Sequence, residues 1–168
     1  MNERDMALGR DWAGEDLTGW FLSEKLNGCR AAWDGYQLWT RGGNLIPAPA
    51  AFIASLPASQ RLDGEIYTGP GQLEASRLAV QFGHWTPSIR FVAFDAPNAP
   101  GNCFERLQVA AAAHADAVKC VVCQANQHAV ELMAKIQLSG GEGIVARQPS
   151  VGYEPGRTSN FLKVKKAL

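Results

Sequence analysis

A hairpin signal near the start of the sequence places the strongest constraint on the fold of this chain. In the segment WDGYQLWT, the pair Asp34-Gly35 separates two stretches of strand-forming residues. An Asp-Gly pair in this setting predicts a tight turn between antiparallel strands, because the turn needs backbone conformations that Gly and Asp tolerate. We therefore expect a sheet built at least partly from antiparallel neighbours, and not a purely parallel sheet with helical crossovers.

The remaining segments extend this pattern to a mixture of strands and helices. Strands are expected at 20–25, 28–33, 61–68, 89–96, 118–124, 143–148 and 159–166. Helices are expected at 50–56, 73–82, 103–117 and in ANQHAVELMAKIQLSGG, with Asn126 as N-cap and Gly140-Gly141 as the stop. Strands outnumber helices, which predicts an α+β fold of two mostly antiparallel β-sheets flanked by helices.

Length and composition indicate an ordinary globular protein. The chain has 168 residues, of which 46% are hydrophobic and 19% charged, and its formal net charge is zero. This length suits one domain, residues 1–168, with a substantial core. A neutral balance argues against a chain that wraps nucleic acid by bulk charge, although a local basic surface remains compatible with it.

Other sequence features bear on the cellular compartment. No segment approaches the roughly 18–20 consecutive apolar residues that span a bilayer, and MNERDMALGRDWAGED has no apolar core of a signal peptide. We therefore expect a cytoplasmic protein with no membrane partner and with reduced cysteines. Cys120 and Cys123 form a single CxxC in an apolar, β-branched run. A buried strand is favoured over a metal or redox site, because no second ligand pair is present.

One lysine stands out by its position. Lys25 is the only lysine among the first 118 residues, although arginine occurs eight times there. It belongs to the first of five short polar clusters at or beside expected strand ends. These clusters are EKLNGCR (24–30), LDGEIY (62–67), FVAFDAP (91–97), GGEGIVAR (140–147) and FLKVKK (161–166). Singly, each is compatible with a turn, a core segment or a solvated tail. Together they supply a lysine nucleophile, two acids, an aromatic residue and two further lysines.

In this order the clusters resemble the motifs of ATP-dependent DNA ligases, whose superfamily includes RNA ligases and mRNA capping enzymes. The resemblance runs from about Gly19 to Lys166, and GWFLSEKLNGCRAAWDGYQLWTRGGN is most similar to the short bacterial Lig E type. It implies the ligase adenylation fold, an ATP-grasp-like nucleotidyl-transferase domain. It also implies ATP and Mg²⁺ (or Mn²⁺) as cofactors and nicked double-stranded DNA as the partner of a monomer.

The resemblance assigns roles around the proposed nucleophile. Lys25 matches the lysine that attacks the α-phosphate of ATP and becomes lysyl-AMP, a reaction that needs an amine able to lose its proton. Glu24, directly before it, falls in the nucleotide-binding set. Arg30 matches the arginine expected to contact the nucleotide and the 5′-phosphate of the nick. Arg41, in TRGGN, matches an arginine that contacts DNA or nucleotide phosphates.

The later clusters complete the implied site. Glu65 matches an acid near the ribose and metal, and Glu142 matches a second acid that helps to place the divalent ion. Phe94 matches the aromatic residue that stacks on adenine. Lys163 and Lys165 match two lysines at the α-phosphate, and their spacing of two places both on one face of a strand. These lysines, Lys25 and Arg30 form the implied catalytic set.

Two departures from the family pattern keep other functions open. The usual Asp of the nucleophile motif is Asn27, which lacks the negative charge. The sequence also stops at Leu168, where DNA ligases continue into an OB-fold domain. Three explanations stay open: a minimal enzyme, an excised domain, or a separate OB-fold or DNA-binding partner that supplies this function. The alternatives are an RNA ligase or other polynucleotide adenylyl-transferase, or a non-catalytic module that binds nucleotides or DNA ends.

Overall fold

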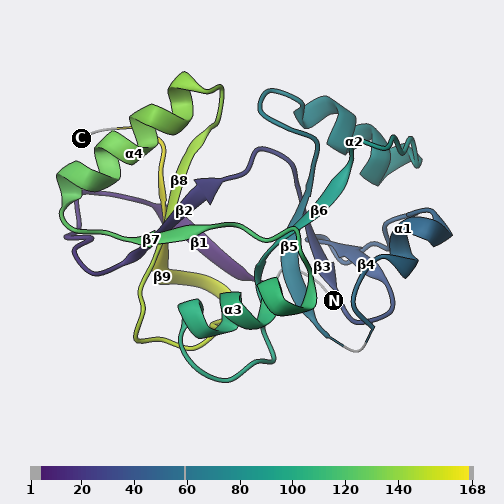
Figure 1. The fold of residues 1–168 in the computed structure, drawn as a ribbon, viewed down its shortest axis with the longest axis horizontal. Coiled ribbons are helices and arrows are strands. Elements are labelled where there is room, and N and C mark those ends of the chain that lie inside the picture. The colour runs from purple at the N-terminus through teal and green to yellow at the C-terminus, as the bar shows by residue number, and fades with distance from the viewer. Residues whose placement is uncertain (1–4, 59, 167–168) are drawn as a thin grey trace.

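Two β-sheets and four helices make up the fold, which a computed structural model describes for residues 5–58 and 60–166. The two sheets lie side by side, one at the left and one at the right of Figure 1. This arrangement confirms the predicted fold class of two sheets flanked by helices. Residues 1–4, part of the stretch considered for a signal peptide, and the end of the range 1–168 lie outside the described residues.

Sheet A has five strands in the order β1-β9-β8-β2-β7. Neighbours in the sheet are antiparallel except β1 and β9, which run parallel with a register shift between Gly9 and Arg10. Its central strand β8 therefore lies between β9 and β2. The strands are β1 (Ala7–Asp11), β2 (Phe21–Lys25), β7 (Cys120–Val122), β8 (Gly143–Arg147) and β9 (Gly156–Val164).

Sheet B contains four strands in the order β4-β3-β5-β6, all antiparallel. They are β3 (Cys29–Trp33), β4 (Leu38–Thr40), β5 (Leu62–Tyr67) and β6 (Arg90–Asp95). The predicted hairpin is confirmed, because β3 pairs with β4 across the turn at Asp34-Gly35. Gly35 has a φ of 104°, and the Asp34 carboxylate accepts hydrogen bonds from the backbone N–H groups of Tyr36 and Gln37 at 2.8 and 2.7 Å.

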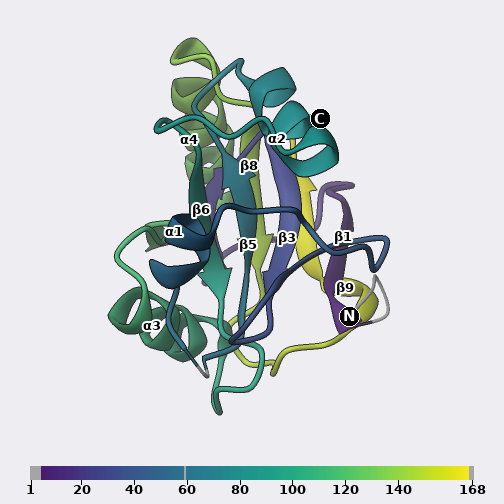
Figure 2. The same ribbon diagram turned by 90° about the vertical axis from the view of Figure 1, so that its right-hand side faces the viewer.

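The helices are divided between the two sheets. Helix α2 (Leu73–Phe82) packs on β3 and β5, and α3 (Cys103–Ala113) packs on β6, whereas α4 (Asn126–Leu138) packs on the strands of sheet A. Helix α1 (Ala50–Ala54) is short. Figure 2 shows α2 and α4 at one end of the molecule and α3 at the other. Each sheet has its own apolar core, centred on residues such as Trp33 and Phe91 in sheet B and Leu22 and Ile144 in sheet A.

Two helix predictions need correction. Asn126 is the first residue of α4 and not its N-cap, which is Ala125. Its side chain instead holds the segment before β2, accepting from the Leu17 N–H at 2.8 Å and donating to the Glu15 carbonyl at 3.1 Å. The helix expected over 103–117 ends at Ala113, because residues 116–118 leave the helix and hydrogen-bond to the backbone of β6.

Three strand predictions also change. The CxxC strand is not buried, since β7 is a three-residue edge strand whose Val121 and Val122 are 46% and 54% exposed. Only Cys123, just past its end, enters the core of sheet A. Strand β1 was not expected, because no motif or clear alternation marks it. The last strand ends at Val164, so Lys165 lies one residue beyond it. No helix among the described residues is long and apolar enough to cross a membrane.

Candidate functional site

A cleft of about 1030 Å³ opens among residues contributed by both sheets. Strands β1, β2, β8 and β9 line it from sheet A, while β3, β4, β5 and β6 line it from sheet B. The cleft brings together all but one of the residues that the sequence predicts for the site, namely Glu24, Lys25, Arg30, Arg41, Glu65, Phe94, Lys163 and Lys165. The remaining residue, Glu142, is not among those that line the cleft, but it forms an ion pair with Lys25, which does.

Lys25 is the last residue of β2, where it pairs with Gly143 at the start of β8. This register places its side chain beside the preceding residue of the β8 segment, Glu142. The Lys25 ammonium Nζ lies 2.5 Å from Glu142 Oε2, and both side chains are largely shielded, at 21% and 27% exposure. Two residues that stand 117 positions apart in the sequence therefore form a close ion pair in the cleft.

After Lys25 the chain crosses from sheet A to sheet B, and Gly28 makes this crossing possible. A Cβ atom at Gly28 would lie 2.2 Å from the Ile66 carbonyl oxygen of β5 and 2.9 Å from Glu65 Cγ. Any larger residue would push the loop off this strand. The close approach also lets the Gly28 N–H donate to Glu65 Oε1 at 3.1 Å. Asn27, which lies between Lys25 and Gly28 in the sequence, is half-buried.

The acids of the cleft differ from freely solvated carboxylates. Burial raises the pKa of Glu65 to about 7, although Arg30, the Gly28 N–H and Lys25 act in the opposite direction. Burial also raises the pKa of Glu24. Because burial disfavours the charged form, a ligand that brings positive charge to Glu65 would recover part of that cost.

Arg30 is engaged with an acid that sequence reasoning did not single out. Its Nε and Nη2 donate to the two carboxylate oxygens of Asp63, each at 2.6 Å, and Nη2 also donates to the Ala7 carbonyl at 3.0 Å. Asp63 is 1% exposed. The DGE cluster that contains Asp63 was recognised, but only Glu65 received a role. Asp63 stands two residues before Glu65, and residues two apart on a strand share one face. This spacing is the feature of the sequence that could have pointed to Asp63 as a site residue.

Phe94 lies at the inner wall of the cleft and is 9% exposed. The guanidinium carbons of Arg30 and Arg147 lie 4.6 and 5.1 Å from its ring centroid, so the contacts of the ring are cation–π contacts. Arg147 comes from the EGIVAR segment and was not singled out either. Adenine stacking on Phe94 stays a prediction, and an adenine there would lie beside these two cations.

Lys163 and Lys165 converge, although the second lies outside the strand. Both ammonium groups face Asp11 Oδ1, at 3.4 and 3.7 Å. The two cations lower the pKa of Asp11, whose side chain is 71% exposed. Asp11 ends β1 and pairs in register with Lys163, so this contact depends on the unexpected parallel pairing of β1 and β9.

The rim of the cleft carries further positive charge. Arg41 lies in the turn that follows β4 and is exposed, and Arg157 on β9 also lines the cleft. Arg157 belongs to no recognised motif. With Arg41, Lys163 and Lys165 it gives a neutral chain a locally basic face toward the cleft, which suits a polyanionic ligand.

The donor set in the cleft fits a metal ion only in part. Among residues 5–58 and 60–166, no group of three or more His, Cys, Asp or Glu side chains could hold a metal. The resemblance to ligases implies two carboxylates as metal ligands, those of Glu65 and Glu142. Mg²⁺ is commonly bound by one or two carboxylates together with water and substrate phosphates. This small acidic set fits that mode, and does not fit an ion held by protein alone.

Comparisons with known proteins agree with this geometry. No family model matches the chain. A DNA ligase of Haemophilus influenzae is 33% identical to it over 97% of this chain, and the chain spans 64% of the length of that ligase. A solved Lig E DNA ligase structure superimposes with a TM-score of 0.85 and is 30% identical, covering 96% of this chain and 68% of its own.

A more distant structure shares the fold. Chlorella virus DNA ligase-adenylate superimposes with a TM-score of 0.80 at 18% identity, over 95% of this chain and 66% of the viral chain. The identity and coverage of the Lig E structure decide the relationship. This chain belongs to the DNA ligase family.

Proposed function

We propose that this chain is the catalytic core of an ATP-dependent DNA ligase, which seals nicks through a lysyl-AMP intermediate. One observation carries the proposal: the lysine at the end of β2, Lys25, lies in a large cleft with its Nζ 2.5 Å from the carboxylate of Glu142. A partly shielded amine beside a carboxylate can be held in place and can pass on its proton, which a lysine nucleophile requires.

In the first step Lys25 Nζ attacks the α-phosphorus of ATP. A P–N bond forms, the P–O bond to the β-phosphate breaks, and pyrophosphate leaves with the bonding electrons. The Lys25 ammonium first loses one proton to become a nucleophile, and the nearby carboxylate of Glu142 is placed to accept it. The second proton passes to water as the phosphoramidate forms. The products are lysyl-AMP and pyrophosphate.

The basic residues of the cleft stabilise the negative charge of the phosphate groups. Lys163 and Lys165 stabilise negative charge that builds up on the α-phosphate, since both line the cleft and their ammonium groups converge on one carboxylate, that of Asp11. Asp11, which pairs with both ammonium groups, shows that an anion can bind between these two lysines. Arg30 and Arg41 contact phosphates of the nucleotide and of the nick.

A divalent ion completes the proposed site. Glu65 and Glu142 are the residues that would hold Mg²⁺ or Mn²⁺, with phosphate oxygens and water as the other ligands. When bound, the ion neutralises phosphate charge and so makes the α-phosphorus easier to attack. Phe94 would place the adenine against the inner wall of the cleft.

Two further transfers complete the proposed reaction. Lysyl-AMP passes its AMP to the 5′-phosphate of a nick, which regenerates the Lys25 amine and forms a pyrophosphate link at the DNA end. The 3′-hydroxyl then attacks the 5′-phosphorus, the phosphodiester bond forms, and AMP leaves. Nicked double-stranded DNA is the proposed partner of a monomeric chain in the cytoplasm.

The test is covalent labelling with ATP that carries an α-phosphate label. The wild type is expected to acquire label in the presence of Mg²⁺, and Lys25→Ala is expected to acquire none. Lys135→Ala, which changes an exposed lysine on α4, serves as the matched control and keeps the label. A folded wild type that binds ATP without labelling would favour a non-catalytic binding module.

A chase then identifies the nucleic acid. Labelled wild type is mixed with nicked DNA or with a nicked RNA duplex of the same sequence. Transfer of label and sealing of the DNA nick support the proposal. Sealing confined to RNA would assign the chain to RNA ligation.

A further inference from the structure

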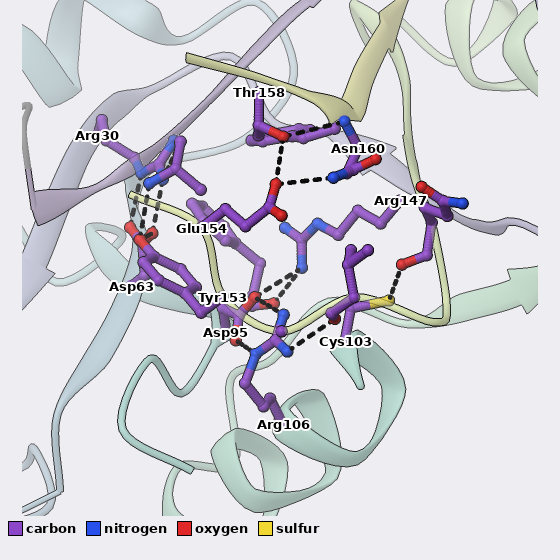
Figure 3. A pocket seen from close by; sticks show the side chains of 16 residues that line it. Arg30, Asp63, Asp95, Cys103, Arg106, Arg147, Tyr153, Glu154, Thr158 and Asn160 are labelled. Carbon is purple, nitrogen blue, oxygen red and sulfur yellow. Dashed lines mark hydrogen bonds and ion pairs between the residues drawn. The ribbon is translucent and has the colours of Figure 1, made fainter. Parts of the chain in front are cut away.

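A closed circuit of hydrogen bonds among Ala7, Arg30, Asp63 and Tyr153 joins the two sheets; Figure 3 labels the last three at a second, smaller pocket. Tyr153, from the segment between β8 and β9, donates its hydroxyl hydrogen to Asp63 Oδ2 and accepts from the Ala7 N–H at 2.9 Å. Arg30 bonds both oxygens of the same Asp63 carboxylate and also the carbonyl of Ala7. Each member of the circuit thus contacts two others.

The circuit determines which part of Arg30 can meet a ligand. Nε and Nη2 are used by Asp63 and Ala7, whereas Nη1 makes no hydrogen bond to any other residue that the structure describes. The side chain is 17% exposed and lines the large cleft. Nη1 is therefore the edge of the guanidinium that remains for a phosphate.

Tyr153 is the member that closes the circuit. Its hydroxyl both donates and accepts, so the O–H bond has one orientation that satisfies both partners. Burial and the neighbouring Asp63 charge raise its pKa, which keeps the hydroxyl protonated and able to donate. Without this donor, Asp63 would keep only its bonds to Arg30, and the two side chains could turn together.

We propose that Tyr153 is a positioning residue that acts on Arg30 through Asp63 and keeps the Nη1 edge of the guanidinium available to phosphates in the cleft. The inference rests on the proposed function, because Arg30 is taken to contact the phosphates of nucleotide and nick. Tyr153 lies outside all five polar clusters that resemble the ligase motifs. It acts at a distance from the reacting atoms, and its effect depends on Arg30.

Tyr153→Phe removes the hydroxyl and keeps the ring, whose packing includes a contact with Arg106 at 5.8 Å from the ring centroid. Tyr36→Phe is the matched control, since that ring is 70% exposed. In ¹⁵N-labelled protein the Arg30 Nε–H signal, identified by its loss in Arg30→Lys, reports on the circuit without any ligand. Its exchange with solvent is expected to be about fivefold faster in Tyr153→Phe, which is the factor expected for the loss of one hydrogen bond. In Tyr36→Phe the exchange rate is expected to stay unchanged.

Labelling kinetics then test the coupling to function. Tyr153→Phe is expected to lower the labelling rate about fivefold in the wild-type background and less than twofold in an Arg30→Lys background, because two residues that act as a unit are not additive. A purely structural role would give the same loss in both backgrounds and would overturn the proposal. Unchanged Nε–H exchange in Tyr153→Phe would also overturn it. A wild type that never labels would refute the proposed function, and with it this role of Tyr153, even where exchange shows the circuit intact.

Discussion

The partly buried carboxyl of Glu65 makes the stability of this protein depend on pH in a predictable direction. Its pKa is about 7 in the folded protein against an ordinary value of 4.5. Between pH 4.5 and 7 the folded chain therefore holds a proton that the unfolded chain has lost. The contribution of Glu65 to stability is largest below this window and falls as pH rises through it, because the folded state must then bear a partly buried charge.

The magnitude follows from the size of the pKa difference. Each pKa unit corresponds to about 1.4 kcal/mol, so the full shift lowers the free energy of unfolding by up to about 3 kcal/mol at pH 7.5 relative to pH 4.5. Glu65→Gln removes the titration and keeps an oxygen that can accept from the Gly28 N–H. The variant is expected to lack this loss of stability.

Urea denaturation of both proteins at pH 4.5, 5.5, 6.5 and 7.5 measures the effect. The difference in unfolding free energy between Glu65→Gln and wild type should grow in favour of the variant as pH rises. Glu74→Gln, an exposed acid at the start of α2, controls for the loss of a surface charge. A difference for Glu65→Gln that is the same at every pH would refute the reasoning, since it would show that this carboxyl does not titrate in the window.

Three further substitutions, one of them with a control variant, test other parts of the structure. Asn27→Asp is expected to speed labelling by ATP, because it restores the family's charge in the nucleophile loop; an equal or slower rate contradicts this. Gly28→Ala should cost about 1–3 kcal/mol in urea denaturation, since its Cβ would lie 2.2 Å from a backbone carbonyl. Gly42→Ala, whose nearest contact is 3.5 Å, should be nearly neutral, and equal costs for the two glycines would refute the steric argument. Arg106→Met should cost about 3–5 kcal/mol by leaving buried Asp95 short of its main partner, and a neutral result would contradict that.

The local parts of this site could be predicted from the sequence. The Asp34-Gly35 turn, the strand that ends at Lys25 and the tight loop at Gly28 follow from short-range rules about turns and strands. The resemblance of the ordered motifs to those of DNA ligases also pointed to Glu65 and Lys163. The structure places both in the same cleft.

The long-range parts could not be predicted in this way. Asp11 belongs to no motif, and it reaches Lys163 only because β1 pairs with β9, which is far away in the sequence. Asp63 and Tyr153 likewise meet across 90 positions. The same cause explains the mistake at Asn126, whose side chain was expected to cap a helix and instead bonds to Glu15 and Leu17. Such contacts depend on which strands become neighbours, and single-sequence patterns carry little information on that choice.

The strand order of sheet A has a consequence for how the protein is made. All strands of sheet B lie within residues 29–95, so that sheet can form while the chain is still being synthesised. Strands β1 and β2 are made first, but they are not neighbours: β1 waits for β9, and β2 waits for β7 and β8. Their pairing closes long loops, which is slow. Lys25 therefore emerges from the ribosome more than a hundred residues before Glu142, and a nascent chain cannot assemble the ion pair on which its proposed chemistry depends.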